Sequence, residues 1–229
     1  MDSAVTSCLV AIGITPRDLS PYRTALNHRS SGSDNNERLE FLGDTVLATV
    51  LSEYLIRRYP ASDEGFLTRM RTKLARGTTQ TMIAEKIGLR QYINLSERAE
   101  NQGKREDDAV AEDAFEAIVG ALFVDRGYEA CAEWIAMTYE AHVDFAEAVR
   151  EQVTNRELLD ATARQMGETV SFEHTKMIRD RHKAIVRMDS PSAPLGVIIG
   201  VGEADSKKVA IEEACKRAVR FFCARRAAA

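Results

Sequence analysis

Apolar residues recur every three or four positions along the first two thirds of the chain, and Pro, Gly and Ser clusters separate the periodic stretches. This spacing is that of one face of an α-helix, and no alternating strand pattern interrupts it. The pattern predicts helices over residues 20–28, 36–59, 65–86, 107–127 and 129–149. Residues 1–148 are therefore expected to form an all-α domain.

The pattern changes after residue 150. A helix is predicted over 155–166, short strands over 170–176, 183–189 and 197–202, and a last helix over 205–225. The segment Ser190-Pro191-Ser192-Ala193-Pro194 has the composition of a turn between the second and third strands. Residues 152–226 are therefore expected to form a small α+β domain of order α-β-β-β-α.

Three carboxylates interrupt the apolar pattern of the helix at 36–59. Glu37, Glu40 and Asp44 stand at relative positions 0, 3 and 7, so they fall within roughly a 60° arc of the helix surface. Carboxylates near a packed interior need a proton, a partner or a metal ion, because burial of an isolated charge is costly. The segment is therefore a candidate for chemistry.

A second acidic pair, Asp113 and Glu116, lies in the apolar helix at 107–127, on the same face as Gly120. If the two helices pack together, Glu40, Asp44, Asp113 and Glu116 form an all-oxygen site, which suits Mg²⁺ or Mn²⁺ better than zinc or copper. Spacing alone leaves a solvated acidic surface as an equal alternative.

Composition narrows the class of protein. The 229 residues carry a net charge of −4, but residues 151–229 hold 14 Lys and Arg against 11 Asp and Glu, so the acids concentrate in the first part. No window approaches the roughly 20 apolar residues of a membrane span, and the start lacks the basic residues of a secretory signal. The four scattered cysteines have no zinc-ligand spacing. We expect free thiols, a cytoplasmic location and no membrane partner.

Four blocks of the chain resemble the ribonuclease III family and occur in the family's order. The blocks are Ala25-Leu26-Asn27-His28-Arg29-Ser30, Asn36 to Asp44, the pair Asp63-Glu64-Gly65 and Leu74-Ala75-Arg76-Gly77, and Asp113 to Asp125. The second block reproduces the family's signature nearly letter for letter.

This resemblance implies an endonuclease domain over residues 1–148 that forms a homodimer and cuts both strands of double-stranded RNA. It implies dependence on Mg²⁺, with Mn²⁺ as a substitute, no small-molecule cofactor, and products with 5′-phosphate and 3′-hydroxyl ends and short 3′ overhangs. The implied metal ligands are Glu40, Asp44, Asp113 and Glu116. Glu37 and Glu64 match two further acids of the catalytic cleft.

The predicted α-β-β-β-α segment, residues 152–226, resembles a double-stranded-RNA-binding domain. Lys207 and Lys208 match the family's lysines at the start of the last helix, and His182 matches a histidine of the loop that enters the minor groove. The Gly-Pro that usually precedes this histidine is replaced by Asp180-Arg181.

Two other functions fit the same residues. One is a viral-type enzyme that cleaves short interfering duplexes and so suppresses RNA silencing, and the other is a non-catalytic protein that sequesters duplex RNA. Phe41, beside the predicted catalytic acids, is either a dimer contact or a core residue of its own subunit.

Overall fold

The computed structural model describes residues 2–152, 154–190 and 193–227. The chain divides into two compact units at residues 152 and 153. The predicted end of the first domain, residue 148, falls inside a helix that belongs to the first unit. Within the described residues, no helix is both long enough and apolar enough to cross a membrane.

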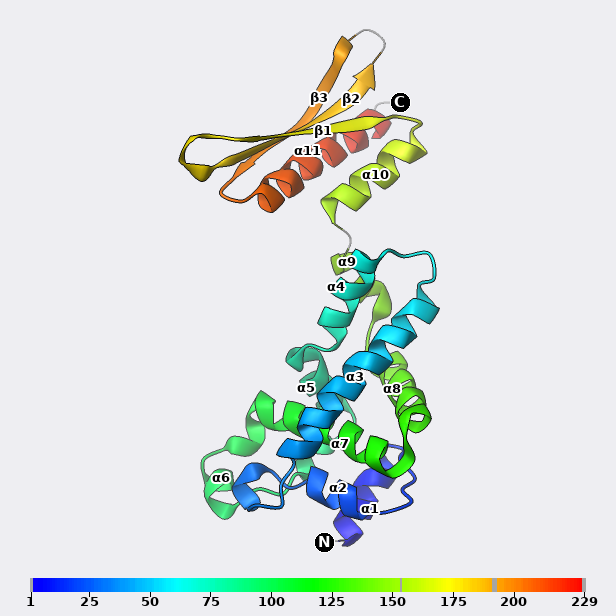
Figure 1. Ribbon diagram of the computed structural model, residues 1–229, viewed down its shortest axis with the longest axis vertical. Helices are drawn as coiled ribbons and strands as arrows, with labels where there is room; N and C mark the ends of the chain where they lie inside the picture. The colour runs from blue at the N-terminus through cyan, green and yellow to red at the C-terminus, as the bar shows by residue number, and fades with distance from the viewer. Residues whose placement is uncertain (1, 153, 191–192, 228–229) are drawn as a thin grey trace. The chain divides into compact units, whose positions relative to one another are not determined.

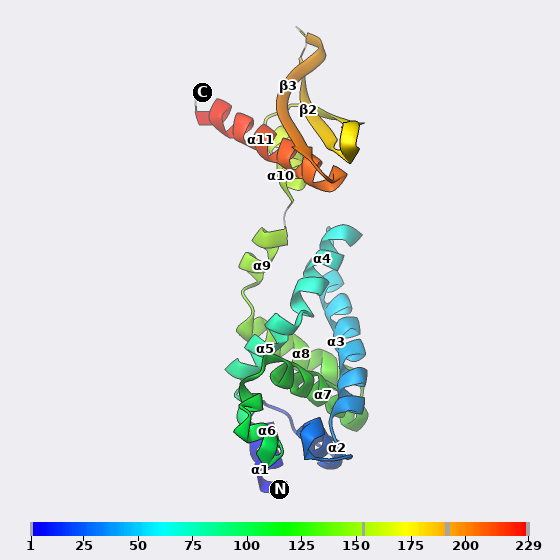
Figure 2. The same ribbon diagram turned by 90° about the vertical axis from the view of Figure 1, so that its left-hand side faces the viewer.

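The first unit is helical, as the periodicity predicts (Figures 1 and 2). Three 3₁₀ helices, η1 (Arg29–Ser31), η2 (Leu89–Tyr92) and η3 (Lys104–Glu106), lie between its α-helices. The α-helices are α1 (Asp2–Ala11), α2 (Ser20–Ala25), α3 (Glu37–Arg58), α4 (Glu64–Leu74), α5 (Gly77–Lys86), α6 (Glu97–Asn101), α7 (Asp108–Arg126), α8 (Tyr128–His142) and α9 (Phe145–Gln152).

Helices α3 and α7 form the centre of this unit and lie side by side in both views (Figures 1 and 2). Two glycines allow the close approach. A Cβ atom at Gly43 of α3 would overlap the backbone carbonyl of Glu116, and one at Gly120 of α7 would overlap the carbonyl of Leu39. Each helix therefore presents its glycine to the backbone of the other helix.

Two predicted helices are each divided in the structure. The helix predicted at 65–86 breaks between α4 and α5, where Gln80 donates to the Ala75 carbonyl (3.1 Å) and Thr79 donates to the Lys73 carbonyl (2.8 Å). The side chains of the second helix thus satisfy carbonyls at the end of the first. The helix predicted at 129–149 breaks before Asp144, whose side chain accepts from the Glu147 amide (2.9 Å) and starts α9.

The helices of the first 30 residues also differ from the prediction. Helix α1, which buries Cys8 and Leu9, was not predicted. Helix α2 ends at Ala25 rather than at residue 28, because Asn27 and His28 leave the helix and pair with the backbone at Asn94.

The second unit has the predicted α-β-β-β-α order and a three-stranded antiparallel sheet in the order β1-β2-β3. Its elements are α10 (Asn155–Gln165), β1 (Val170–Lys176), η4 (Ile178–Asp180), β2 (His182–Ser190), β3 (Ala193–Ala204) and α11 (Lys207–Ala227). Residues 191–192 of the predicted turn lie outside the described residues, and its remaining residues belong to β2 and β3, so β3 begins earlier than predicted.

Helix α11 packs closely on the sheet in the second unit. A Cβ atom at Gly200 or at Gly202 of β3 would overlap the carbonyl of Ala214 or Ala210 respectively. Ala210, Ala214 and Phe222 are fully buried. The cysteines carry free thiols, as expected, and Cys8, Cys131 and Cys215 are buried.

Candidate functional site

The crossing of α3 and α7 brings together the helix turns that carry four predicted ligands. Glu40 and Asp44 flank Gly43 on α3, and Asp113 and Glu116 lie on α7 at the turn that Gly43 contacts. Because the helix backbones meet at this point, carboxylates from segments about 70 residues apart become neighbours. The glycine contacts therefore build the site as well as the core.

Glu116 is the most buried of these carboxylates, with 8% of its surface exposed. Burial, together with the charges of Asp44, Glu112 and Glu40, raises its pKa to about 7. Gln80 Nε2 donates a 2.8 Å hydrogen bond to Glu116 Oε1, which acts in the opposite direction. Near neutral pH the Glu116 side chain is therefore poised between its protonated and charged forms.

The pKa values of the neighbouring acids Glu40 and Asp113 are also raised. Burial and the charges of Asp113 and Glu37 raise the pKa of Glu40. Burial also raises the pKa of Asp113, although Arg29 and His28 oppose that rise. The charges of neighbouring carboxylates contribute to these shifts after burial, and a bound cation would offset that contribution.

The donor set fits a hard divalent ion. Every predicted ligand is a carboxylate, and Gln80 Oε1 is a buried oxygen without a hydrogen-bond partner in the part of the chain that the structure describes. Within residues 2–152, 154–190 and 193–227, no three His, Cys, Asp or Glu side chains are already gathered as a metal site. Ligation would therefore require side-chain movement, which is easiest for the exposed Asp44.

The two remaining predicted acids, Glu37 and Glu64, differ in their relation to the cluster. Glu37 is exposed, and its charge acts on Glu40 and Asp113, so it belongs to the same cluster. Glu64 lies in the first turn of α4, where it accepts a 2.8 Å hydrogen bond from Thr68 and lines a groove of about 450 Å³. Among the interactions described for this chain, none joins Glu64 to the cluster.

Two residues of the cluster were missed in the sequence. Glu112 lies beside Asp113, and burial together with the charges of Asp113 and Asp44 raises its pKa. Its carboxylate occupies the space that a Cβ at Gly77 would need. Gln80 is fully buried. Gly77 belongs to a block that resembles the family, but nothing in that block indicates that its glycine makes room for an acid.

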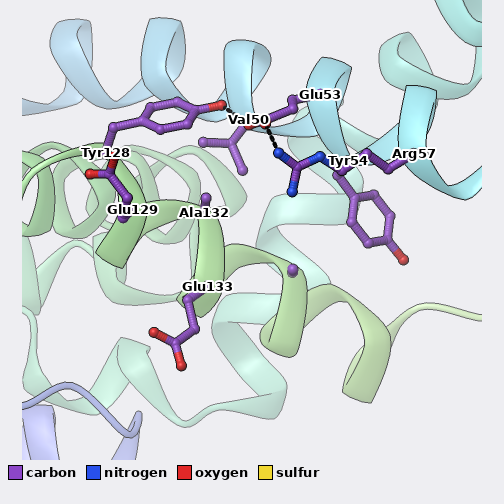
Figure 3. Close-up of a pocket in the computed structure, with 9 residues that line it drawn as sticks. Val50, Glu53, Tyr54, Arg57, Tyr128, Glu129, Ala132 and Glu133 are labelled. Carbon is purple, nitrogen blue, oxygen red and sulfur yellow. Dashed lines mark hydrogen bonds and ion pairs between the residues drawn. The ribbon is translucent and has the colours of Figure 1, made fainter.

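A pocket between α3 and α8 is separate from this cluster. It has a volume of about 440 Å³ and contains none of the predicted catalytic residues (Figure 3). Glu53 points into it, accepts a hydrogen bond from the Tyr128 hydroxyl and forms an ion pair with Arg57. The carboxylate of Glu53 is therefore already engaged by its own chain.

In the second unit, the predicted RNA-binding residues stand at the starts of two elements. Lys207 opens α11 and His182 opens β2. The ring of His182 stacks on that of His174 of β1, whose pKa is lowered by desolvation and by the charge of Lys207. His174 was missed in the sequence, although it shares an alternation with Phe172 along β1. Lys208 is exposed.

Comparison with known proteins identifies relatives across most of the chain. Residues 20–143 match the family described as Ribonuclease-III-like. The chain is 35% identical over 209 residues to "Ribonuclease 3" of Methylococcus capsulatus, covering 90% of this chain and 89% of that protein. It is 34% identical over 218 residues to "Ribonuclease 3" of Pelotomaculum thermopropionicum, covering 91% and 89%. The match to the Coxiella burnetii enzyme is 40% identical and covers 56% of this chain and 54% of that protein.

Solved structures support the same relationship for the first unit. The nuclease domain of ribonuclease III from Campylobacter jejuni superposes with a TM-score of 0.59 at 33% identity, covering 61% of this chain and 98% of that one. Dicer from Pichia stipitis superposes with a TM-score of 0.51 at 23% identity, covering 90% and 95%, which indicates a shared fold.

Proposed function

The chain belongs to the ribonuclease III family, and from that premise we propose that it is an endoribonuclease that hydrolyses double-stranded RNA with Mg²⁺. The proposed products carry 5′-phosphate and 3′-hydroxyl ends with short 3′ overhangs. Mn²⁺ is the expected substitute, and no small-molecule cofactor is required. The observation that carries the proposal is the acidic cluster at the crossing of α3 and α7.

Glu40, Asp44, Asp113 and Glu116 are the proposed metal ligands. A bound Mg²⁺ would supply a water of lowered pKa and would neutralise charge on the scissile phosphate and the leaving oxygen. Gln80 orients Glu116 through its 2.8 Å hydrogen bond, and a cation would offset the charges of the neighbouring carboxylates that help to raise the pKa values of Glu40, Asp113 and Glu116. The cluster supplies the negative charge that a divalent cation needs. The proposed hydrolysis requires no Ser or His nucleophile.

Glu37 and Glu64 are proposed to act on substrate rather than as ligands in the same cluster. Glu37 is exposed next to it, which suits a contact with RNA or with a bound water. Glu64 lies in the first turn of α4 and lines a groove that contains none of the other proposed catalytic acids, so its proposed role is a contact with substrate or support of a site in the cleft.

We propose that the second unit is a double-stranded-RNA-binding domain. Lys207 and Lys208 stand in the first turn of α11, where the ammonium groups and the helix dipole both favour a phosphate. His182 starts β2, next to the segment expected to reach the minor groove. Such contacts recognise the phosphates and 2′-hydroxyls of A-form RNA, so shape rather than base sequence is expected to decide binding.

A homodimer is the proposed assembly. Phe41 is 80% exposed, which removes the alternative that it is a core residue of its own subunit. An exposed aromatic side chain next to the catalytic acids is a favourable dimer contact. The Campylobacter jejuni nuclease domain is itself described with a region involved in dimer formation.

The test compares the wild type with Glu116→Gln on a long labelled RNA duplex, with and without Mg²⁺. The variant keeps the size of the side chain and removes a ligand charge. Loss of several kcal/mol of charge stabilisation would slow cleavage by at least about a thousandfold while duplex binding persists. Binding without cleavage by both proteins, in Mg²⁺ and in Mn²⁺, would instead favour the non-catalytic sequestering protein.

The silencing-suppressor alternative requires cleavage of short duplexes. A series of duplexes of decreasing length therefore separates it from a processing enzyme for longer RNA. Failure to cut a duplex of the size of a short interfering RNA, under conditions in which long duplexes are cut, would eliminate that alternative.

A further inference from the structure

Two histidines of the second unit face each other on neighbouring strands. The rings of His174 on β1 and His182 on β2 stack with centroids 5.1 Å apart and planes inclined by 21°. His174 Nε2 and His182 Nδ1 are 2.9 Å apart, which is a hydrogen-bond distance. Because each of these nitrogens either donates or accepts, one ring donates to the other.

This contact makes the two rings one titrating unit. If both rings were imidazolium, two N–H groups and two positive charges would meet across 2.9 Å. The pair can therefore gain one proton while the contact is kept, and that proton belongs to the pair rather than to either ring. His174 Nδ1 and His182 Nε2 remain for other partners.

The surroundings of His174 disfavour its charged form. Desolvation, the Lys207 ammonium on α11 and His182 itself lower the pKa of His174. Among the described residues, no carboxylate forms an ion pair with Lys207. The other charges around the pair are matched in ion pairs, namely Lys176 with Asp180 (2.7 Å), Arg181 with Asp205 (3.6 Å) and Lys183 with Glu203 (3.0 Å).

Resting on the proposed binding of duplex RNA, we propose that His174 and His182 form one imidazole pair that contacts the RNA backbone beside Lys207 and takes up a single proton on binding. A phosphate placed against Lys207 offsets the repulsion that disfavours a charged His174, and it also attracts an imidazolium. The bound state then holds one proton more than the free state. By linkage, affinity rises as pH falls, by at most tenfold for each pH unit.

The test measures duplex affinity of the full chain against pH. A Glu116→Gln background in buffer with a chelator prevents cleavage, and a labelled RNA duplex of about 20 base pairs exceeds the span of one such domain. Fluorescence anisotropy at constant ionic strength, from about pH 5.5 to pH 8, covers the titration of ordinary imidazoles. The wild-type pair should give an affinity that rises toward low pH.

The variants separate a pair from two independent histidines. His174→Gln, His182→Gln and the double variant should show the same reduced pH dependence, because a proton shared across the contact between the rings requires both of them. His142→Gln changes a histidine at the end of α8 in the first unit and should keep the wild-type slope. Additive losses from the two single variants, or a pH slope that survives in the double variant, would overturn the pair while leaving RNA binding intact.

NMR titration of the protein with both histidines present gives a result that does not depend on whether the variants fold correctly. The imidazole resonances of His174 and His182 should titrate together, and their apparent pKa should rise when the duplex is added. No rise with saturating RNA would refute the proton uptake. A chain that binds duplex RNA at no pH would refute the proposed function of this unit, and the inference with it.

Discussion

The two units of this protein handle functional charge in opposite ways. In the first unit, Glu116 is 8% exposed and its neighbouring carboxylates crowd the crossing of two core helices. In the second unit, Lys207 and Lys208 are exposed at the start of a helix, where water screens them. The first arrangement costs stability and suits binding of a compact cation, whereas the second costs little and suits an extended polyanion.

The same packing device serves both arrangements. Gly43 and Gly120 let α3 and α7 approach closely, and Gly200 and Gly202 let β3 approach α11. In the first unit this contact lies within the proposed metal site, so packing and the proposed chemistry involve the same residues. In the second unit the contact between the glycines and α11 lies in the core and involves neither of the exposed lysines. Changes in the first unit should therefore affect stability and activity together.

The largest expected effect comes from Gly43→Ala. The added Cβ would overlap the Glu116 carbonyl, which is backbone and cannot rotate away. We expect a loss of more than about 4 kcal/mol in the free energy of unfolding, or no folded first unit. Urea unfolding followed by fluorescence of Trp134, the single and buried tryptophan, reports on this unit. Thr45→Ala, at an exposed position of the same helix, should change stability by less than about 0.5 kcal/mol.

The next effect is the pH dependence of stability without metal. The pKa of Glu116 is about 7 in the folded protein and near 4.5 when unfolded, so the folded state holds its proton to higher pH. Stability should therefore fall as pH rises from about 5 to 8, by about 2 to 3 kcal/mol from this group. Glu116→Gln should lack this dependence, and Mg²⁺ should restore wild-type stability at pH 8. A wild type that gains stability over this range would contradict the buried acidic cluster.

A smaller effect is expected in the second unit. Replacing Lys207 and Lys208 together by Gln should weaken duplex binding about tenfold and reduce the slope of log affinity against log salt by about two. Unfolding followed at Trp134 should not change, because the lysines are exposed in the other unit. Lys216→Gln together with Arg220→Gln, at two exposed positions farther along α11, is the control that removes the same amount of charge. Equal effects of the two double variants would mean that net charge alone governs binding.

The smallest effect on stability is expected from Phe41→Ala. The side chain is 80% exposed, so the free energy of unfolding of the monomer should change by less than about 0.5 kcal/mol. The dimer should nevertheless weaken, as measured by light scattering after size exclusion over a range of concentrations. Met137→Ala, which removes another exposed apolar side chain in the first unit, should leave the dimer unchanged. A stable Phe41→Ala dimer would place the main contact elsewhere.

Element type and order were largely predictable from sequence because they depend on local periodicity. The helices that carry the acids and the α-β-β-β-α segment were both predicted. Helix boundaries were predicted less well. The break between α4 and α5 depends on Thr79 and Gln80 satisfying carbonyls of the preceding helix, and such partners cannot be identified before the chain is folded.

The acids, their helical spacing and the resemblance to a nuclease family could all be recognised in the sequence. Tertiary structure decided which of these acids share a cluster, because that depends on where α3 and α7 cross. It added Glu112 and Gln80 to the cluster and separated Glu64 from it. It also brought His174 to His182, since strand pairing sets which side chains meet across a sheet. Local pattern thus specifies elements, whereas burial, charge coupling and contacts between distant residues arise only when those elements pack.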